Sequence, residues 1–343
     1  MLANIPVYIS NLRSNPSYPK YKSYHWADYI ELLCLANIDN EISKADLIDR
    51  MAERESDLGE GDIDTIEEME VFEKEDNQIA TKRSSKADAW DERIEDLFRL
   101  IEHRISIYGD YYPFILEHNT LKLKIEQLEN PQLTYSYLLF CSNLYLFDNE
   151  DRLELANNFE LLCLQVLKNI LPSNAIVELF GKNPLNKEGY VGSLWDKIQL
   201  LAKSLNEQIH PMLPQENYPP QNTGDDGLDL VGYIPSGDLL PSKLTFFGQC
   251  ACTTEWVSKQ HSSSYDAWKT KITITTSTNN LIFMPFCFRA ATGEWASIGD
   301  IHNSLLIDRK RIIFYLKENF KSFEDLPSYN LVNNFVLAKE GVF

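Results

Sequence analysis

Two short stretches, GDDGLDLVGYI at 224–234 and LTFFGQCAC at 244–252, decide the fold of the C-terminal half of the chain. Each contains a run of apolar, β-branched and aromatic residues next to turn-forming residues, which is typical of a strand. Asp229 stands near the start of the first strand, and Gln249 stands inside the second. The pattern therefore predicts a strand-loop-strand unit that carries a carboxylate and an amide.

These two side chains are suited to holding a divalent cation. Adjacent strands lie about 4.8 Å apart, so an Asp229 carboxylate and a Gln249 amide oxygen on one face converge on a single ion. Mg²⁺ prefers such hard oxygen ligands and takes only one or two carboxylates from a protein. Cleavage of a phosphodiester uses a cation of this kind to polarise the phosphoryl oxygen and to generate a hydroxide. Gly224 and Gly227 are expected to let a phosphate backbone approach closely.

The two stretches resemble the restriction-endonuclease-like superfamily of PD-(D/E)xK nucleases. The similarity is closest to the type IV restriction endonuclease branch, whose pattern is G-D-x-G-x-D on one strand and Q-x-K on the next. Gly224, Asp225, Gly227 and Asp229 match the first half of this pattern, and Gln249 matches the second. The resemblance covers about residues 190–343. It implies a Mg²⁺- or Mn²⁺-dependent DNA endonuclease of the kind that defends bacteria against phage.

One member of the pattern is absent, because the expected lysine two residues after Gln249 is Ala251. Such a lysine would stabilise developing negative charge. The candidate replacements are Lys259, Lys269 and Lys271 in the following segment, and Lys259 is preferred because it is nearest to the end of the strand. The alternative for Lys259 is an ordinary solvent-facing helix residue.

The resemblance also implies an acidic residue from the preceding helix. Asp196 is the first candidate and Glu207 the second, and a plain surface carboxylate is the alternative for both. The alternative role of Asp225 and Asp226 is to form a turn before the strand, for which aspartate side chains are suited. Trp256 and Trp268 are expected to pack in the core rather than to stack on bases.

Around this unit the chain alternates between helix and strand. Helices are predicted at 193–209, at 255–271 and from 308 onward, and a third strand at 280–289. This order predicts an α/β fold in which a mixed sheet is flanked by helices. The stretch 181–189 is rich in turn residues, which places a nuclease domain at 190–343 and another domain at 1–180.

The N-terminal domain is predicted to be mostly helical, with helices at 43–54, 87–108, 133–147 and 151–171 and a helical pattern around 26–38. Ser43 is placed as an N-cap. Between 53 and 76 the chain carries 12 acidic residues against Arg54 and Lys74. Such a run is usually a solvated face, but a DNA mimic or an arm that docks on a basic partner is the alternative.

The composition is that of a globular protein, with 44% hydrophobic and 24% charged residues and a net charge of −19. We expect no transmembrane segment and no secretion signal. Four of the six cysteines lie in apolar runs, and Cys250 and Cys252 have no second pair nearby in the sequence that would complete a zinc set. We therefore expect free thiols. Free thiols indicate a reducing compartment, so the expected location is the cytoplasm.

Two functions of different classes follow. The first is the nuclease subunit of an antiphage system, which binds DNA together with a helicase or another ATPase docked on the N-terminal half. By analogy with enzymes that use two active sites to cut a duplex, a homodimer is expected. The second is a degenerate nuclease fold kept as an interaction or sensor module, which the missing lysine and the acidic charge favour.

Overall fold

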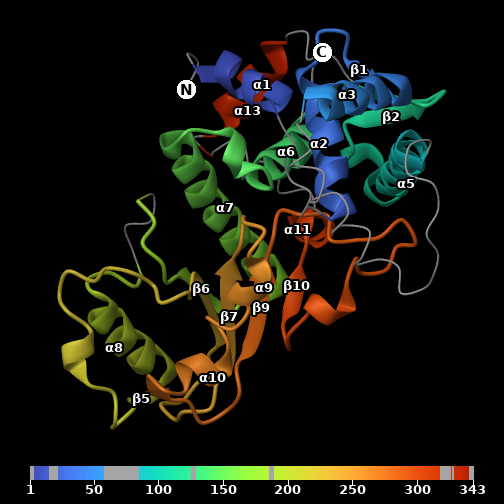
Figure 1. The fold of residues 1–343 in the computed structure, drawn as a ribbon. Helices are drawn as coiled ribbons and strands as arrows, with labels where there is room; N and C mark the ends of the chain where they lie inside the picture. The colour runs from blue at the N-terminus through green and yellow to red at the C-terminus, as the bar shows by residue number, and fades with distance from the viewer. Residues whose placement is uncertain are drawn as a thin grey trace. The chain divides into compact units, whose positions relative to one another are not determined.

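The chain is a mixed α/β protein, seen in a computed structural model (Figure 1). The structure describes residues 4–14, 22–57, 85–124, 129–184, 189–316, 326 and 328–339. Two compact units divide the chain. Unit 1 comprises Met1–Leu139, Phe288–Ala296 and Asn330–Phe343, and unit 2 comprises Phe140–Cys287 and Ser297–Tyr329.

Unit 2 contains a five-stranded mixed sheet with the order β10-β9-β7-β6-β4. Its strands are β4 (Ile176–Leu179), β6 (Leu230–Ile234), β7 (Leu244–Cys250), β9 (Asn279–Phe283) and β10 (Leu305–Ile307). Strands β4, β6 and β7 are antiparallel neighbours, whereas β7, β9 and β10 run parallel. In the register of the central pair, Leu230 lies opposite Gly248 and Val231 opposite Phe247.

Helices cover both faces of this sheet. The helices of unit 2 are α7 (Asn149–Ile170), α8 (Leu194–Leu205), α9 (Trp256–Lys259), α10 (Tyr265–Trp268) and α11 (Arg309–Leu316). On the α7 side, a side chain at Gly232 would lie 2.9 Å from Leu171 Cδ1, so glycine lets α7 pack closely on β6. On the other side, Val231 and Phe247 share one buried cluster with Ile198 of α8 and Trp268 of α10.

Local sequence signals fix the ends of the two main helices. Asp148 caps α7 by accepting hydrogen bonds from the backbone N–H groups of Glu150 and Asp151. Ser193 and Asp196 form a capping box at the start of α8. Asn206 ends α8 in the left-handed conformation with φ 58°, and β5 (Gln208–Ile209) then pairs with β8 (Ile272–Thr273).

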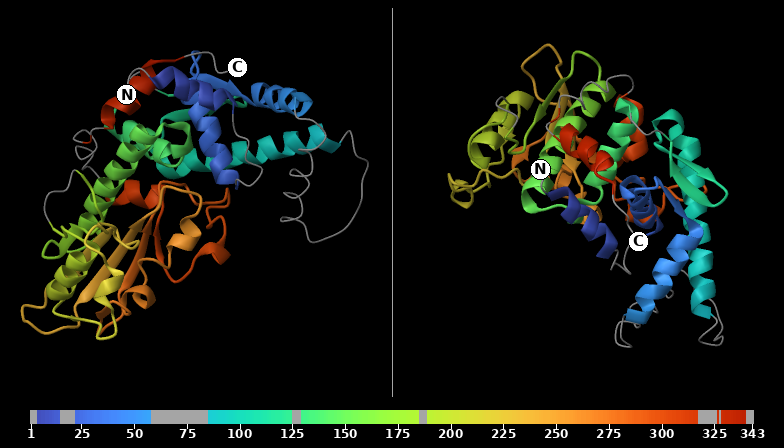
Figure 2. Two further views of the ribbon diagram at one scale, coloured as in Figure 1. Left: turned by 60° about the vertical axis from the view of Figure 1, so that its left-hand side comes forward. Right: turned by 90° about the horizontal axis from the view of Figure 1, so that it is seen from above.

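Unit 1 combines helices with a small three-stranded sheet of order β1-β3-β2. Its elements are α1 (Ile5–Ser14), α2 (Ser23–Ala36), β1 (Glu41–Ser43), α3 (Lys44–Asp57), α5 (Ser85–Tyr108), β2 (Phe114–Glu117), β3 (Thr120–Leu123) and most of α6 (Asn130–Cys141) and α13 (Tyr329–Leu337). Helices α3 and α5 lie side by side (Figure 2). The predicted N-cap at Ser43 is confirmed, because its Oγ accepts a hydrogen bond from the Asp46 backbone N–H at 3.1 Å.

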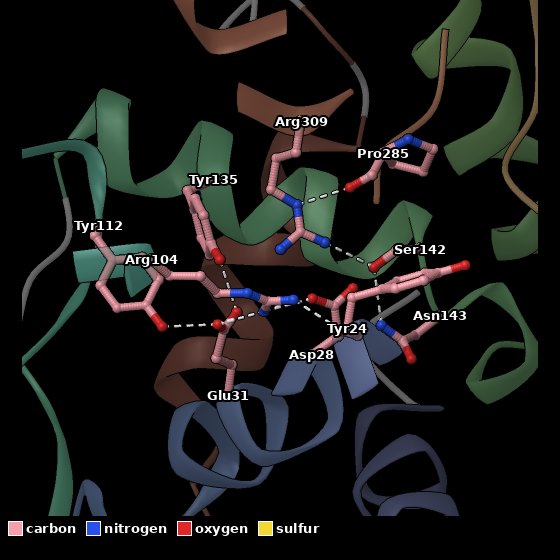
Figure 3. Close-up of polar contacts among 10 residues, drawn as sticks. All are labelled: Tyr24, Asp28, Glu31, Arg104, Tyr112, Tyr135, Ser142, Asn143, Pro285 and Arg309. Carbon is pink, nitrogen blue, oxygen red and sulfur yellow. Dashed lines mark hydrogen bonds and ion pairs between the residues drawn. The ribbon is translucent and has the colours of Figure 1, made fainter. Parts of the chain in front are cut away.

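A fully buried charged cluster holds unit 1 together (Figure 3). Arg104 of α5 forms ion pairs with Asp28 and Glu31 of α2, at 2.7 and 2.5 Å. Tyr112 and Tyr135 donate hydrogen bonds to the two oxygens of Glu31 at 2.7 and 2.8 Å. Since the arginine and both acids are buried, each depends on the others for the interactions that water would otherwise supply.

Most predicted elements are present with altered limits. Helix 193–209 ends at Leu205, strand 280–289 ends at Phe283, and the predicted helix 255–271 is two short helices, α9 and α10. The small sheet of unit 1 was not predicted. The acidic segment beyond Asp57 lies outside the described residues.

The boundary between the units differs from the predicted one at 181–189. Helix α7 and strand β4 belong to unit 2, because β4 pairs with β6 along its whole length and α7 packs on the same sheet. Unit 2 therefore begins at Phe140 rather than near residue 190. This change places Glu160 of α7, whose charge acts on Asp229, in the same unit as the predicted site.

Candidate functional site

Asp229 and Gln249 lie side by side at the centre of the unit 2 sheet. The Gln249 Nε2 amide donates to Asp229 Oδ2 at 2.6 Å, and the Cys250 backbone N–H donates to the same oxygen at 2.6 Å. Asp229 continues β6, since its backbone N–H donates to Gly248 O at 2.9 Å. Only 5% of Asp229 and 7% of Gln249 is exposed, so a charge on Asp229 lies in a region of low dielectric.

Two further acids act on Asp229. Burial raises the pKa of Asp229 well above its usual range, and the charges of Glu160 on α7 and of Asp225 add to this rise. Burial also raises the pKa of Glu160 to about 7, and Asp225 contributes, although the Asn183 side chain opposes the shift by donating to Glu160 Oε2 at 3.0 Å. The three acids thus crowd negative charge into one buried region, which a cation would stabilise.

Among the candidate lysines, Lys259 is the one whose charge acts on Asp229. Its positive charge lowers the Asp229 pKa, as the smallest of the named contributions. Lys269 pairs instead with Asp266, and Lys271 pairs with Asp226 at 2.8 Å. Lys259 is the last residue of α9, and Ala251 at the position of the family lysine is fully buried.

The two predicted helix acids have structural partners. Asp196 Oδ2 accepts hydrogen bonds from the backbone N–H and the hydroxyl of Ser193, at 2.9 and 2.7 Å, in the capping box of α8. Glu207 binds the Thr275 backbone N–H and hydroxyl, both at 3.0 Å. The acid that the structure brings to Asp229 from a helix is Glu160. The sequence analysis missed it because α7 was assigned to the other domain.

The motif residues before β6 form a turn. Asp225 Oδ1 accepts a hydrogen bond from the Gly227 backbone N–H at 2.8 Å, as the turn prediction required. Gly227 has φ +77°, and a Cβ built on it would lie 2.3 Å from Ser262 Cβ. The room that this glycine provides is therefore filled by Ser262, rather than left open for a phosphate backbone.

A pocket of about 420 Å³ opens beside the carboxylates. Gly181 lines it, and a Cβ at Gly181 would lie 3.5 Å from both Asp225 Oδ2 and Asp229 Oδ1. Lys182 and Lys197 also line the pocket, and the Lys197 ammonium donates to Thr223 O and Gly224 O at 3.0 Å each. The pocket is thus lined by Gly181, the residue that lies against Asp225 and Asp229, and by two lysines.

The remaining singled-out residues pack in the core. Trp256 is 1% exposed and Trp268 is fully buried, as predicted.

All six cysteines are free. The Cys250 thiol is influenced by Cys163, and the Cys252 thiol by Cys141, in pairs that the sequence spacing does not reveal. Burial raises the pKa of the Cys250 and Cys252 thiols well above the usual range, which makes them poor nucleophiles.

The donor set around Asp229 fits a hard divalent cation. Within the described part of the chain, no three or more His, Cys, Asp and Glu side chains are grouped to hold a metal ion. Mg²⁺ needs fewer protein ligands, because it keeps several of its waters and takes carboxylate and amide oxygens. Asp229 supplies one such oxygen, and Gln249 can supply a second only after its amide turns, because Nε2 now faces Asp229 and Oε1 accepts from Ser262 Oγ at 2.9 Å. The raised pKa values of Asp229 and Glu160 mark a place where added positive charge is favourable.

Comparison with known proteins adds no relative. No protein-family model, no curated protein and no solved structure matches this chain. Among the described residues, no helix is long and apolar enough to cross a membrane. Any assignment of function therefore rests on the geometry of the site itself.

Proposed function

We propose that unit 2 is a metal-dependent DNA endonuclease whose site is built on Asp229 and Gln249. The observation that carries this proposal is the 2.6 Å contact between their buried side chains on neighbouring strands, with the partly buried acids Glu160 and Asp225 acting on Asp229. A Mg²⁺ or Mn²⁺ ion bound there would polarise a phosphoryl oxygen and lower the pKa of a bound water.

Each side chain of the site then has a distinct role. Asp229 and the amide oxygen of Gln249 hold the cation. Glu160, with a pKa raised to about 7, is suited to accept a hydrogen bond or a proton from the attacking water. Lys259, whose charge already acts on Asp229, takes the place of the absent strand lysine and stabilises negative charge that develops on the phosphate.

The arrangement of the elements supports the resemblance to PD-(D/E)xK nucleases. Helix α7 is followed by the antiparallel strands β6 and β7, then by α9 and α10, and then by β9 parallel to β7. In this scheme Glu160 on α7 is the acid from the preceding helix, the role first proposed for Asp196.

The pocket beside the acids suits one strand of DNA. Lys182, which is exposed, would face the phosphate backbone, which is bound mainly through such cations. A chain with a net charge of −19 would bind DNA weakly by itself. We therefore propose a helicase or another ATPase as a cytoplasmic partner that docks on unit 1 and supplies affinity, in a bacterial defence system. A homodimer would bring two sites to a duplex.

The test is a cleavage assay on plasmid and linear DNA with Mg²⁺ or Mn²⁺, with and without any ATPase found to be encoded beside the gene. We expect nicking or cleavage by the unmodified chain in the presence of Mg²⁺ or Mn²⁺, and a loss of at least about 100-fold in Asp229→Ala and in Gln249→Ala. Lys269→Ala, which alters an exposed ion pair, is the matched control. If the unmodified chain leaves the DNA intact under all of these conditions, the proposal fails.

Two observations favour the second function, an interaction or sensor module. Ala251 replaces the family lysine, and the nitrogen of the Gln249 amide, rather than its oxygen, faces Asp229. An inactive module would bind its partner or DNA equally well with Asp229 or with alanine at this position. Equal binding of both chains, together with no cleavage by either, would establish that reading.

A further inference from the structure

Ser262 lies in the loop between α9 and α10, against the candidate metal ligand Gln249. Its Oγ is 2.9 Å from Gln249 Oε1 and 2.7 Å from Lys259 O. Both of these partners are acceptors, but a serine hydroxyl has a single hydrogen to donate. In this arrangement the hydrogen is shared, and one of the two contacts is only partly satisfied.

The other end of the Gln249 amide faces the carboxylate. Nε2 donates to Asp229 Oδ2 at 2.6 Å, so the atom nearest to Asp229 is the amide nitrogen, which is not a metal ligand. A rotation of the amide by 180° places Oε1 beside Asp229, where it can bind a cation. Nε2 then faces Ser262 Oγ and donates to it, which leaves the serine hydrogen for Lys259 O alone. Ser262 can therefore serve the amide in both orientations, as acceptor or as donor.

The motif glycine holds Ser262 in this place. A Cβ at Gly227 would lie 2.3 Å from Ser262 Cβ and 3.2 Å from Gln249 Oε1, so any other residue would push the serine away from the amide. The contact with Lys259 O also connects Ser262 to α9, the helix that carries the candidate lysine. Ser262 thus contacts both the second strand of the site and the segment that follows it.

We propose that Ser262 is a positioning residue that allows the Gln249 amide to turn when a cation binds: nitrogen toward Asp229 without the cation, oxygen toward it with the cation. This inference rests on the proposed metal site. An amide has one oxygen and one nitrogen, so it needs a partner such as Ser262 that can accept either end. A carboxylate has two oxygens and would need no such partner.

The test is a double-mutant cycle read by equilibrium binding of Mn²⁺ and Mg²⁺ to the full chain, measured by calorimetry. We expect Ser262→Ala to weaken binding about five- to tenfold when residue 249 is glutamine, since one hydrogen bond that orients the amide is lost. In a Gln249→Glu background the same change is expected to alter binding less than twofold, because both oxygens of a carboxylate can bind the cation. Ser258→Ala, which removes a similar exposed contact with Glu255 O, is the control and should change nothing.

Two outcomes separate this inference from the proposed function. Absence of cation binding by the unmodified chain would overturn both. Binding that Ser262→Ala weakens equally in the two backgrounds would overturn this inference alone. A second readout needs no Ser262 variant: the side-chain NH₂ resonances of Gln249, assigned by their loss in Gln249→Glu, should shift on addition of Mg²⁺. If these resonances do not shift at saturating Mg²⁺, the proposed turn of the Gln249 amide is contradicted.

Discussion

The Gln249 amide donates to the Asp229 carboxylate at 2.6 Å, across the antiparallel strands β7 and β6. The same carboxylate oxygen also accepts the Cys250 backbone N–H. Two hydrogen bonds thus fix the orientation of a buried acid whose pKa is raised by its burial and by neighbouring acids. The predictions below follow from this contact and from the side chains that support it.

Gly227→Ala should damage both stability and the site. The change places a Cβ at φ +77° and within 2.3 Å of Ser262 Cβ, so we expect a loss of about 3 kcal/mol, from backbone strain and overpacking together. Gly237→Ala is the matched control, because Gly237 has φ +78° with nothing within 4 Å of its Cβ position. It should cost only about 1 kcal/mol, measured by urea unfolding. Equal losses in the two variants would show that the contact with Ser262 has no energetic effect.

Glu160→Gln should change how stability depends on pH. The folded-state pKa of Glu160 is raised to about 7 from an ordinary value of 4.5, so the folded chain binds this proton more tightly than the unfolded chain does. The contribution of Glu160 to stability is therefore fully present below pH 4.5 and is lost as pH rises toward 7. We expect the melting temperature of the cation-free chain to fall between pH 5 and 7.5, and to fall less in Glu160→Gln.

Asp196→Asn is the control for the Glu160 measurement. Hydrogen bonds from Ser193 lower the pKa of Asp196, so its stabilising effect is present above its ordinary pKa and is lost only on acidification. This variant should lower the melting temperature slightly, by a similar amount at pH 5 and at pH 7.5. If both variants keep the pH profile of the unmodified chain, the electrostatic account of Glu160 is wrong.

Lys259→Ala should reduce cleavage by about 100-fold or more while leaving cation affinity within a few-fold of normal. The lysine is expected to stabilise charge on the phosphate rather than to bind the cation. Lys269→Ala should cleave DNA at the normal rate, because its ammonium pairs with Asp266. Comparable losses in the two variants would indicate that neither lysine has a special role.

Arg104→Leu should destabilise unit 1 by about 3–5 kcal/mol, because it leaves Asp28 and Glu31 buried without their cation. Arg99→Ala, on the same helix, removes an exposed pair with Asp96 and should cost at most about 0.5 kcal/mol. Chemical unfolding followed by circular dichroism measures both. A loss below about 1 kcal/mol in Arg104→Leu would mean that the cluster is not structural.

The contact between Asp229 and Gln249 could be predicted from the sequence, because strand periodicity and a short connection place them on one face of adjacent strands. Glu160 could not, because nothing local in α7 shows that β4 pairs with β6 and draws the helix into unit 2. The break in the predicted helix 255–271 also has a tertiary cause. The Gln260 side chain binds Asp300 O and the His302 backbone N–H. Ser262 and Ser264 donate locally to Lys259 O and His261 O, whereas Ser263 donates to Asn280 Oδ1 on β9.

The most direct measurement is a crystal structure of the full chain soaked with Mn²⁺, with the ion located by its anomalous signal. The account predicts one ion with Asp229 and the Gln249 amide oxygen as ligands at about 2.2 Å, and the amide nitrogen turned toward Ser262. Loss of that ion in Asp229→Asn would strengthen the assignment. Saturating Mn²⁺ with no ion beside Asp229, or with the Gln249 nitrogen still donating to the carboxylate, would contradict it.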